Sequence, residues 1–100
     1  MPRHDVTSGA IAACKCVLGE NIIRACDNNG TIYLKKRHGI NCQIVMESPT
    51  RGNIVQFFED NNDRVIPRYQ SYFFNTLDDL QDIIFCLYST KIKLSAAAYQ

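Results

Sequence analysis

The side chains with the greatest capacity for chemistry in this chain are its five cysteines, namely Cys14, Cys16, Cys26, Cys42 and Cys86. Cys14 and Cys16 are separated by one residue, so on a β-strand both would point to one face and could begin a zinc site. A closed zinc site needs four ligands, and the chain has no C-x-x-C pair. We therefore interpret the cysteines as small buried hydrophobic residues, with Cys86 in the core, and predict no metal and no cofactor.

Groups suited to catalysis are sparse. A Cys–His nucleophile pair needs a histidine near a thiol, yet His4 lies in an expected frayed terminus and His38 in an expected turn. Asp78 and Asp79 are adjacent carboxylates. Neighbouring helix positions point about 100° apart, so the two would not converge as an acid and a base. The sequence therefore predicts a protein that is not an enzyme.

One basic cluster stands out, at "LKKRHG". The candidate nucleic-acid-binding residues are Lys35, Lys36, Arg37, Arg51 and Arg68. The aromatic side chains that could stack bases beside them are Tyr33, Phe57, Tyr69 and Tyr72. The net charge of +1 gives no strong overall field, and the alternative is a solvated hairpin. Weak nucleic-acid binding is therefore one hypothesis.

A second set of residues is predicted to contact protein partners. Phe57 and Phe58 point to opposite faces of a strand, so one of them lies outside the core that buries Ile54. An outer apolar side chain suggests a partner or self-association, and the alternative is a strand buried on both sides. The predicted interaction face comprises Val55, Phe57, Tyr69, Tyr72, Asp78, Asp79 and Asp82.

The elements that position these residues are mostly strands. Turn signals separate the runs "AIAACKCVL", "NIIRACD", "TIYLKKR", "NCQIVME" and "NIVQFFE", which predicts an antiparallel meander. "DNNG" is a hairpin turn, and alternation places Ile32 and Leu34 on one face, opposite Tyr33. Pro67 cannot donate to a strand ladder, so "VIPRYQSYFF" is an edge strand or a loop that crosses the sheet.

The apolar period changes to that of a helix near the end of the chain. The residues that repeat at helical spacing are Leu77, Leu80, Ile83, Ile84, Leu87 and Tyr88. Asn75 or Thr76 can cap this helix, and the acidic residues that follow suit the positive end of its dipole. We predict a helix over about 76–89 and, at "KIKL", a short strand or a continuation of the helix.

The totals predict one globular domain over residues 1–100, with residues 1–9 frayed. Hydrophobic residues make up 46% and charged residues 21% of the chain. The fold class is α+β: an antiparallel β-meander of five or six strands closed by one C-terminal amphipathic helix. No run of about 18 apolar residues occurs, so we expect no membrane span. An odd cysteine count without a secretory signal predicts an intracellular protein, in the cytoplasm, the nucleus or both.

Several short segments resemble one viral family. "VIP", "FFNTLDDLQDII" and "LY", with "CQIVMESPT" before them, are similar to the pathogenicity protein of betasatellites, the small DNA satellites of plant geminiviruses. The resemblance covers about residues 30–93. The chain has about thirty additional N-terminal residues, lacks the family's second acidic, Met-rich helical segment, and has a longer spacing after "VIP". The resemblance implies a symptom determinant that suppresses RNA silencing, binds nucleic acid with little sequence preference, self-associates and binds host regulators.

Our leading hypothesis is a non-catalytic protein-interaction protein, specifically a small viral accessory factor that suppresses a host defence pathway such as RNA silencing. The expected partners are a host protein, a second copy of the chain in a homodimer, and, weakly, nucleic acid. The alternative is a polo-box or pleckstrin-homology-like interaction domain of a larger cellular protein, since such domains share the order of strands and then a helix.

Overall fold

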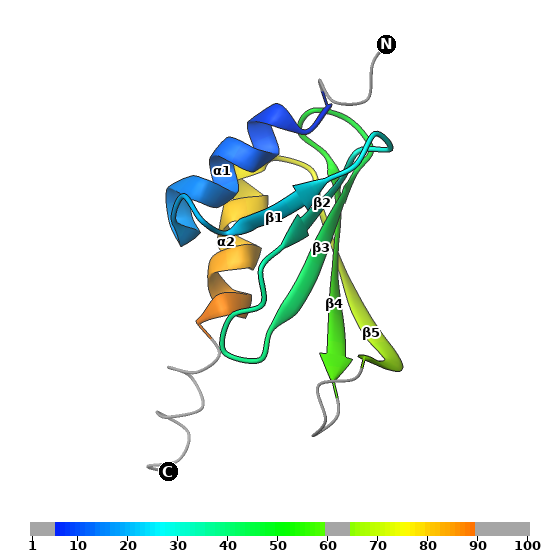
Figure 1. The fold of residues 1–100 in the computed structure, drawn as a ribbon. Coiled ribbons are helices and arrows are strands. Elements are labelled where there is room, and N and C mark those ends of the chain that lie inside the picture. Colours follow the sequence, from blue (N-terminus) through cyan, green and yellow to red (C-terminus); the bar gives the residue numbers. More distant parts are fainter. Residues whose placement is uncertain (1–5, 60–64, 90–100) are drawn as a thin grey trace.

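Five strands and two helices build the protein. The structure is a computed structural model that describes residues 6–59 and 65–89, with no side chains described at 58–59 and 65–68. Its elements are α1 (Ser8–Leu18), β1 (Ile23–Cys26), β2 (Thr31–Leu34), β3 (Asn41–Met46), β4 (Gly52–Glu59), β5 (Val65–Phe74) and α2 (Leu77–Tyr88). The strands form one antiparallel sheet in the order β1-β2-β3-β4-β5 (Figure 1). The predicted α+β meander followed by a C-terminal helix is confirmed.

The first element is a helix and not the predicted strand. Alanine is the best helix former, and α1 contains three alanines. Its buried side chains recur at helical spacing, at Ala10, Ala13, Cys14 and Leu18. Cys14 is buried whereas Cys16 is exposed, so the expectation that both thiols share one face is wrong.

The chain is ordered before α1 as well. Val6 and Thr7 are both buried, at 5% and 2% exposure, and the carbonyl of Thr7 accepts the backbone N–H of Ile11 at 2.8 Å. The prediction of a frayed terminus is therefore wrong for residues 6–9, and its remaining part, residues 1–5, lies outside the described residues.

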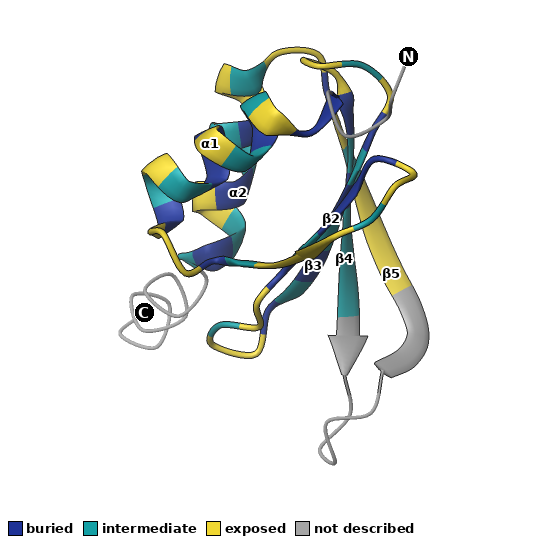
Figure 2. Ribbon diagram, turned by 45° about the horizontal axis from the view of Figure 1, so that its top comes forward, coloured by how far each residue is buried: buried dark blue, intermediate teal, exposed yellow. Residues whose placement is uncertain are grey.

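Both helices pack on the same face of the sheet (Figures 1 and 2). Small residues on α1 allow it to approach α2 closely: a Cβ added at Gly9 would lie 3.1 Å from Leu77 Cδ1. The two helices are also joined by a hydrogen bond, because Gln81 Nε2 donates to the carbonyl oxygen of Ala13 at 3.2 Å. The two helices thus form one layer, and neither of them covers the opposite face of the sheet (Figures 1 and 2).

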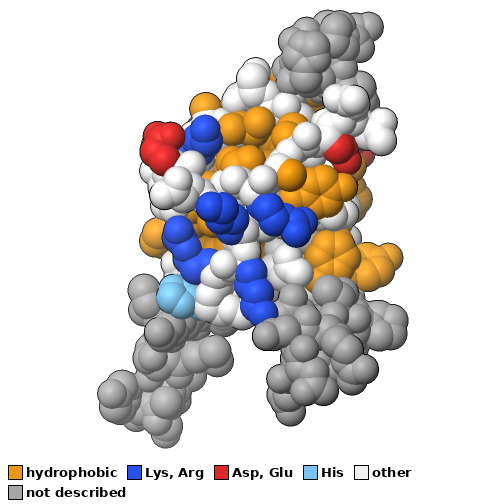
Figure 3. All heavy atoms as spheres, in the orientation of Figure 1, with side chains coloured by type: hydrophobic (Ala, Val, Ile, Leu, Met, Phe, Trp, Pro, Cys, Tyr) orange, Lys and Arg blue, Asp and Glu red, His pale blue; other side chains and the backbone are white. Residues whose placement is uncertain are grey.

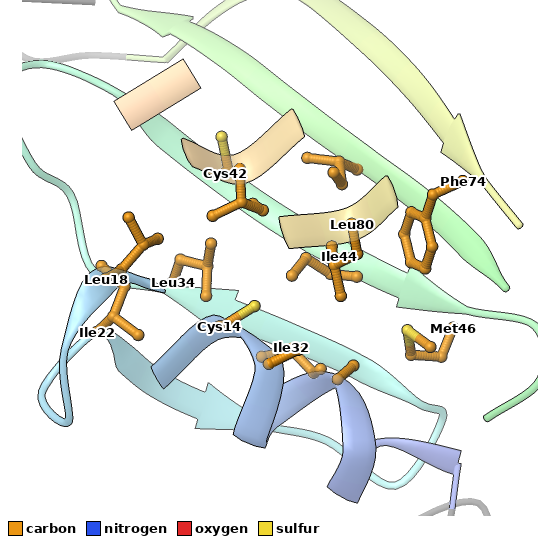
Figure 4. Close-up of a cluster of buried hydrophobic side chains, with 14 of the residues drawn as sticks. Cys14, Leu18, Ile22, Ile32, Leu34, Cys42, Ile44, Met46, Phe74 and Leu80 are labelled. Carbon is orange, nitrogen blue, oxygen red and sulfur yellow. The ribbon is translucent and has the colours of Figure 1, made fainter. Parts of the chain in front are cut away.

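The hydrophobic core lies between that helical layer and the sheet. Figure 4 shows Cys14 of α1, Ile32 and Ile44 of the sheet, and Leu80 of α2 directed toward one another. Each of these four side chains has 0% exposure. The predicted alternation is confirmed, since the core also takes Leu34, Cys42 and Met46 from the same strand face.

The C-terminal helix matches its prediction closely. Thr76 caps α2, and its Oγ1 accepts the backbone N–H of Asp79 at 3.0 Å. The buried side of the helix carries Leu80, Ile84 and Tyr88. Cys86 is exposed, so its predicted place in the core is wrong: it lies two positions from the buried residues on either side and points away from them. The predicted element at "KIKL" lies outside the described residues.

The turns and edges of the sheet follow local chemistry. Gly30 has a φ of 86°, as the "DNNG" turn between β1 and β2 requires. Strand β5, which contains Pro67, is at one edge of the sheet, which confirms the edge-strand interpretation. Strand β1 forms the other edge, with an irregularity in its register between Ile23 and Ala25.

Candidate functional site

The face of the sheet opposite α1 and α2 presents aromatic and polar side chains. We call it the open face, and it includes Tyr33, Asn41, Gln43, Val55, Phe57, Tyr69 and Ser71. Residues on this face alternate with core residues along each strand: Ile44 pairs with Ile54 in the core, whereas Gln43 pairs with Val55 on the other side. Phe57 therefore lies on the face opposite Ile54, as one of the two adjacent phenylalanines was expected to do.

Three of the four aromatic residues predicted to stack bases lie on the open face. Tyr33 pairs with Gln43, Asn41 pairs with Phe57, and Phe57 in turn pairs with Tyr69. Tyr33, Phe57 and Tyr69 therefore form a diagonal row across β2, β4 and β5. Tyr69 is 66% exposed, which leaves most of its ring accessible.

The fourth aromatic residue lies on the other side of the sheet. Tyr72 pairs with Ile54, and its hydroxyl donates to Gln70 Oε1 at 2.7 Å, with Gln56 Oε1 at 3.2 Å. Its ring packs against the core. The expectation that Tyr72 shares a face with Tyr69 is therefore wrong, because the two are separated by an odd number of strand positions.

A depression lies between the first two aromatic residues of the row. Its volume is about 260 Å³, and its lining residues are Arg24, Tyr33, Asn41, Cys42, Gln43 and Phe57. The pairing of strands places Tyr33 on one side of β3 and Phe57 on the other, with the amides of Asn41 and Gln43 between them. The guanidinium of Arg24 lies 5.4 Å from the centre of the Tyr33 ring, a cation–π contact.

Asp27 fixes the position of Tyr33. The Tyr33 hydroxyl donates to Asp27 Oδ2 at 3.1 Å, while Asp27 Oδ1 accepts the backbone N–H groups of Thr31 and Asn29, each at 2.9 Å. These bonds to the carboxylate, above all that from Thr31, hold the pKa of Asp27 below its usual range. The same contact raises the pKa of Tyr33, because its ionised form would face a negative charge. The ring is thus held as a neutral hydrogen-bond donor.

Basic side chains collect beside this site. Figure 3 shows Lys and Arg side chains gathered next to hydrophobic ones, with acidic side chains toward the margins of that group. We define the basic edge as Arg24 on β1 together with Lys35, Lys36 and Arg37, which follow β2. The backbone of Lys35 donates to Ile22 at 2.7 Å, which keeps this segment beside β1, and Arg37 Nη2 donates to the carbonyl of Leu18 at 3.0 Å.

The other two predicted basic residues do not join this group. Arg51 lies in the turn between β3 and β4, at the opposite end of β3 from Asn41, and pairs with Glu47 at 3.2 Å. The expectation of one patch that includes Arg51 is therefore wrong. Arg68 belongs to β5 beside Tyr69, and its side chain lies outside the described ones.

The predicted interaction face is divided by the sheet. Val55, Phe57 and Tyr69 lie on the open face. The carboxylates of α2 are all exposed and belong to the helical layer on the other side, at Asp78, Asp79 and Asp82. These residues thus form two separate surfaces, one aromatic and one acidic, and Asp78 and Asp79 of the acidic surface lie in the first turn of α2.

Metal and membrane sites have no support in the described residues. Within 6–59 and 65–89, no three His, Cys, Asp or Glu side chains come together in a way that could hold a metal ion. Neither helix of that part of the chain is long and apolar enough to cross a membrane.

The chain was compared with known protein families, curated proteins and solved structures. No protein-family model matches the chain, and searches of the curated proteins and of the solved structures find no match. The function proposed below therefore rests on the geometry of the open face and on the chemistry of its residues.

Proposed function

We propose that this chain is a non-catalytic binding protein whose open face takes single-stranded nucleic acid. The observation that carries the proposal is the row of Tyr33, Phe57 and Tyr69 beside the basic edge. Proteins that bind single strands combine aromatic platforms for the bases with cationic groups for the phosphates. Here the Arg24 guanidinium lies against the Tyr33 ring, so a cationic group and an aromatic platform occur together.

The dimensions of the row suit a short stretch of single strand. From β2 to β5 there are three strand spacings of about 4.8 Å, or roughly 14 Å. Sheets of similar size stack two or three splayed bases on aromatic residues. The aromatic residues would hold the bases, and Arg24 and Lys35 would lie near the backbone of the strand at the β1 side.

The separation of charges supports a nucleic-acid ligand despite the small net charge. The acidic residues of α2 are in the helical layer, away from the open face, and Glu47 is paired with Arg51 at the far end of β3. The small net charge of +1 is therefore a sum over separate surfaces, which include a basic edge and an acidic helix. Binding to phosphates depends on the local potential, to which the basic edge contributes four cations and Asp27, beside Tyr33, one carboxylate.

In the cell, such a protein would act by sequestering nucleic acid in stoichiometric amounts. That activity agrees with a small viral accessory factor that suppresses RNA silencing, working in the cytoplasm, the nucleus or both. The segments with the betasatellite resemblance support this role, because they include most of β3, whose Gln43 belongs to the open face.

The second candidate is a protein-interaction domain of polo-box or pleckstrin-homology type. One observation favours it: the edge strand β5 carries two exposed aromatic residues, Tyr69 at 66% and Phe73 at 74% exposure. An edge strand with such side chains can add a strand from a host protein or from a second copy of the chain. Its binding would not depend steeply on salt.

The proposal is tested by measuring how a labelled single-stranded RNA of mixed sequence binds the protein. Fluorescence anisotropy at several salt concentrations gives the affinity. We expect affinity to fall steeply with salt, because bound phosphates release counterions. Substituting Arg24→Gln and Lys35→Gln together should reduce the slope by about 0.7 for each phosphate that is no longer neutralised. The control is Arg51→Gln, which removes one positive charge at the other end of β3 and should leave the slope unchanged.

The aromatic row has its own matched pair of variants. Tyr69→Ala should weaken binding roughly five- to a hundredfold, the range expected when one base no longer stacks. Phe85→Ala, which removes a comparably exposed ring (57%) from α2, should leave affinity unchanged. A chain that ignores RNA at low salt, and instead forms a dimer whose affinity does not vary with salt, would refute the proposal and favour the interaction domain.

A further inference from the structure

We infer that the depression between Tyr33 and Phe57 is a subsite for one nucleobase and that Gln43 makes it prefer adenine. This inference rests on the proposed function, because it assigns a specificity to the same open face. It goes beyond that function in predicting that binding depends on sequence at one position of the strand.

The depression is large enough for one base. Pockets that enclose whole small molecules usually measure roughly 300–1,000 Å³. At about 260 Å³, this depression lies just below that range and can take a base. We place the attached sugar and phosphate outside it, toward the basic edge, where Lys35 follows Tyr33 by two residues.

The walls provide surfaces for stacking. Tyr33 and Phe57 rise on either side of β3. The Arg24 guanidinium lies against the Tyr33 ring and adds a flat cationic surface that can also stack on a base. Because Asp27 holds the Tyr33 hydroxyl and the turn before β2 together, this wall is in place before a ligand arrives.

The floor provides the means to distinguish bases. Gln43 lies between the two rings and is half-buried, and its side chain makes no hydrogen bond within the described part of the chain. A carboxamide offers one acceptor and two donors on neighbouring atoms. Adenine presents the complementary pair, an N6 amine that donates and an N7 that accepts, so a glutamine can bond it twice. Asn41, which already has an interaction of its own, completes the polar floor.

The test compares the affinities of oligo(A), oligo(C) and oligo(U) of equal length for the protein at one salt concentration. Oligo(A) should bind at least about fivefold more tightly than the other two, the lower limit for a bidentate contact. Gln43→Ala should abolish that preference without changing the salt slope. Gln43→Glu keeps the shape but leaves only acceptors, so it should move the preference toward oligo(C), whose N4 amine donates.

The control is Ser71→Ala, which removes a polar group from the same face two strands away and should preserve the preference for oligo(A). Melting temperatures of all variants show that each is folded. Equal affinity for the three oligomers, unchanged by Gln43→Ala, would overturn the base subsite and leave the proposed function intact. Absence of binding to every oligomer would overturn both.

Discussion

Phe57 and Tyr69 lie directly opposite each other on β4 and β5, on the face of the sheet opposite the core residue Ile54. The core is on the other side, so this aromatic pair is not required to fill it. A cross-strand pair contributes only about 0.2–1 kcal/mol to stability. Stability and the proposed binding therefore depend on opposite faces of the same sheet, and they can be separated experimentally.

The first prediction compares one residue from each face. Leu80→Ala, in the fully buried part of α2, should lower the free energy of unfolding by about 2–5 kcal/mol. Tyr69→Ala should lower it by less than about 1 kcal/mol, since its ring is mostly exposed. Urea titration followed by circular dichroism measures both. Comparable decreases for the two variants would show that the open face is covered by another part of the protein.

The second prediction concerns Asp27 and acid. Its pKa is lowered in the folded protein, so its contribution to stability is complete above the unfolded value of about 3.9. That contribution is lost as pH falls through the lower, folded value. Asp27→Asn keeps the shape but does not titrate, so the variant should be less stable than the natural protein at pH 7. The difference between them should shrink as the pH falls below about 4.

Unfolding free energies at several pH values, measured on both proteins, give that difference directly. The matched control is Asn28→Ala in the same turn, where neither side chain titrates, so the difference should not narrow as the pH falls. A gap between Asp27→Asn and the natural protein that stays constant down to about pH 3 would contradict the hydrogen bonds to Thr31, Asn29 and Tyr33.

The third prediction uses the thiols. Burial raises the pKa of both Cys14 and Cys42 to about 12, so at about pH 8 neither forms the reactive thiolate, and neither is accessible. Cys16, Cys26 and Cys86 are exposed. Iodoacetamide should therefore add three groups to the native protein and five to the protein in urea, as measured by intact mass. A native value other than three would contradict the assignment of α1 or of β3.

Local signals in the sequence were sufficient for most of the fold. The "DNNG" turn, the alternation in β2 and β3, and Pro67 in an edge strand each act over a few residues, and each was predicted correctly. The same holds for α2, whose period, cap and acidic first turn all agree.

The first helix was missed because its signals conflict. Ile11 and Val17 favour a strand, and Thr7, at the N-cap position, makes no side-chain capping bond. The alanine content and the spacing of Ala10, Cys14 and Leu18 could have identified it. Treating this segment as a strand then led directly to the incorrect idea that Cys14 and Cys16 share a face.

The candidate site was predicted only in part, for a different reason. Tyr33, Phe57 and Tyr69 were recognised one by one as aromatic residues able to stack bases. The depression between Tyr33 and Phe57 depends on which residues pair across β2, β3 and β4, and no local pattern fixes that register. For the same reason no local pattern marked Gln43 as a binding residue. Arg24 lies at the register irregularity of β1, which the sequence does not predict either.

The last prediction tests that register where three strands meet. Gly52 pairs with Met46 on β3 and with Phe74 on β5. A Cβ at this position would collide with the carbonyl oxygen of Val45 and would lie 3.0 Å from Phe74 Cζ. The glycine is therefore required by space, because the Phe74 ring packs over its backbone.

Gly52→Ala should lower the free energy of unfolding by about 1–3 kcal/mol, because the buried Phe74 ring and the backbone of β3 have little freedom to move aside. At a position with space for a methyl group, a Gly→Ala change would instead raise the free energy of unfolding by about 0.4–1 kcal/mol, since it restricts the unfolded chain. The sign of the effect is thus the informative quantity. As a control, Thr50→Ala changes an exposed residue in the turn that precedes β4 and should alter the free energy of unfolding by less than about 0.5 kcal/mol. If Gly52→Ala were as stable as the natural protein, β4 would pair with its neighbours in another register, and the row of Tyr33, Phe57 and Tyr69 would not form.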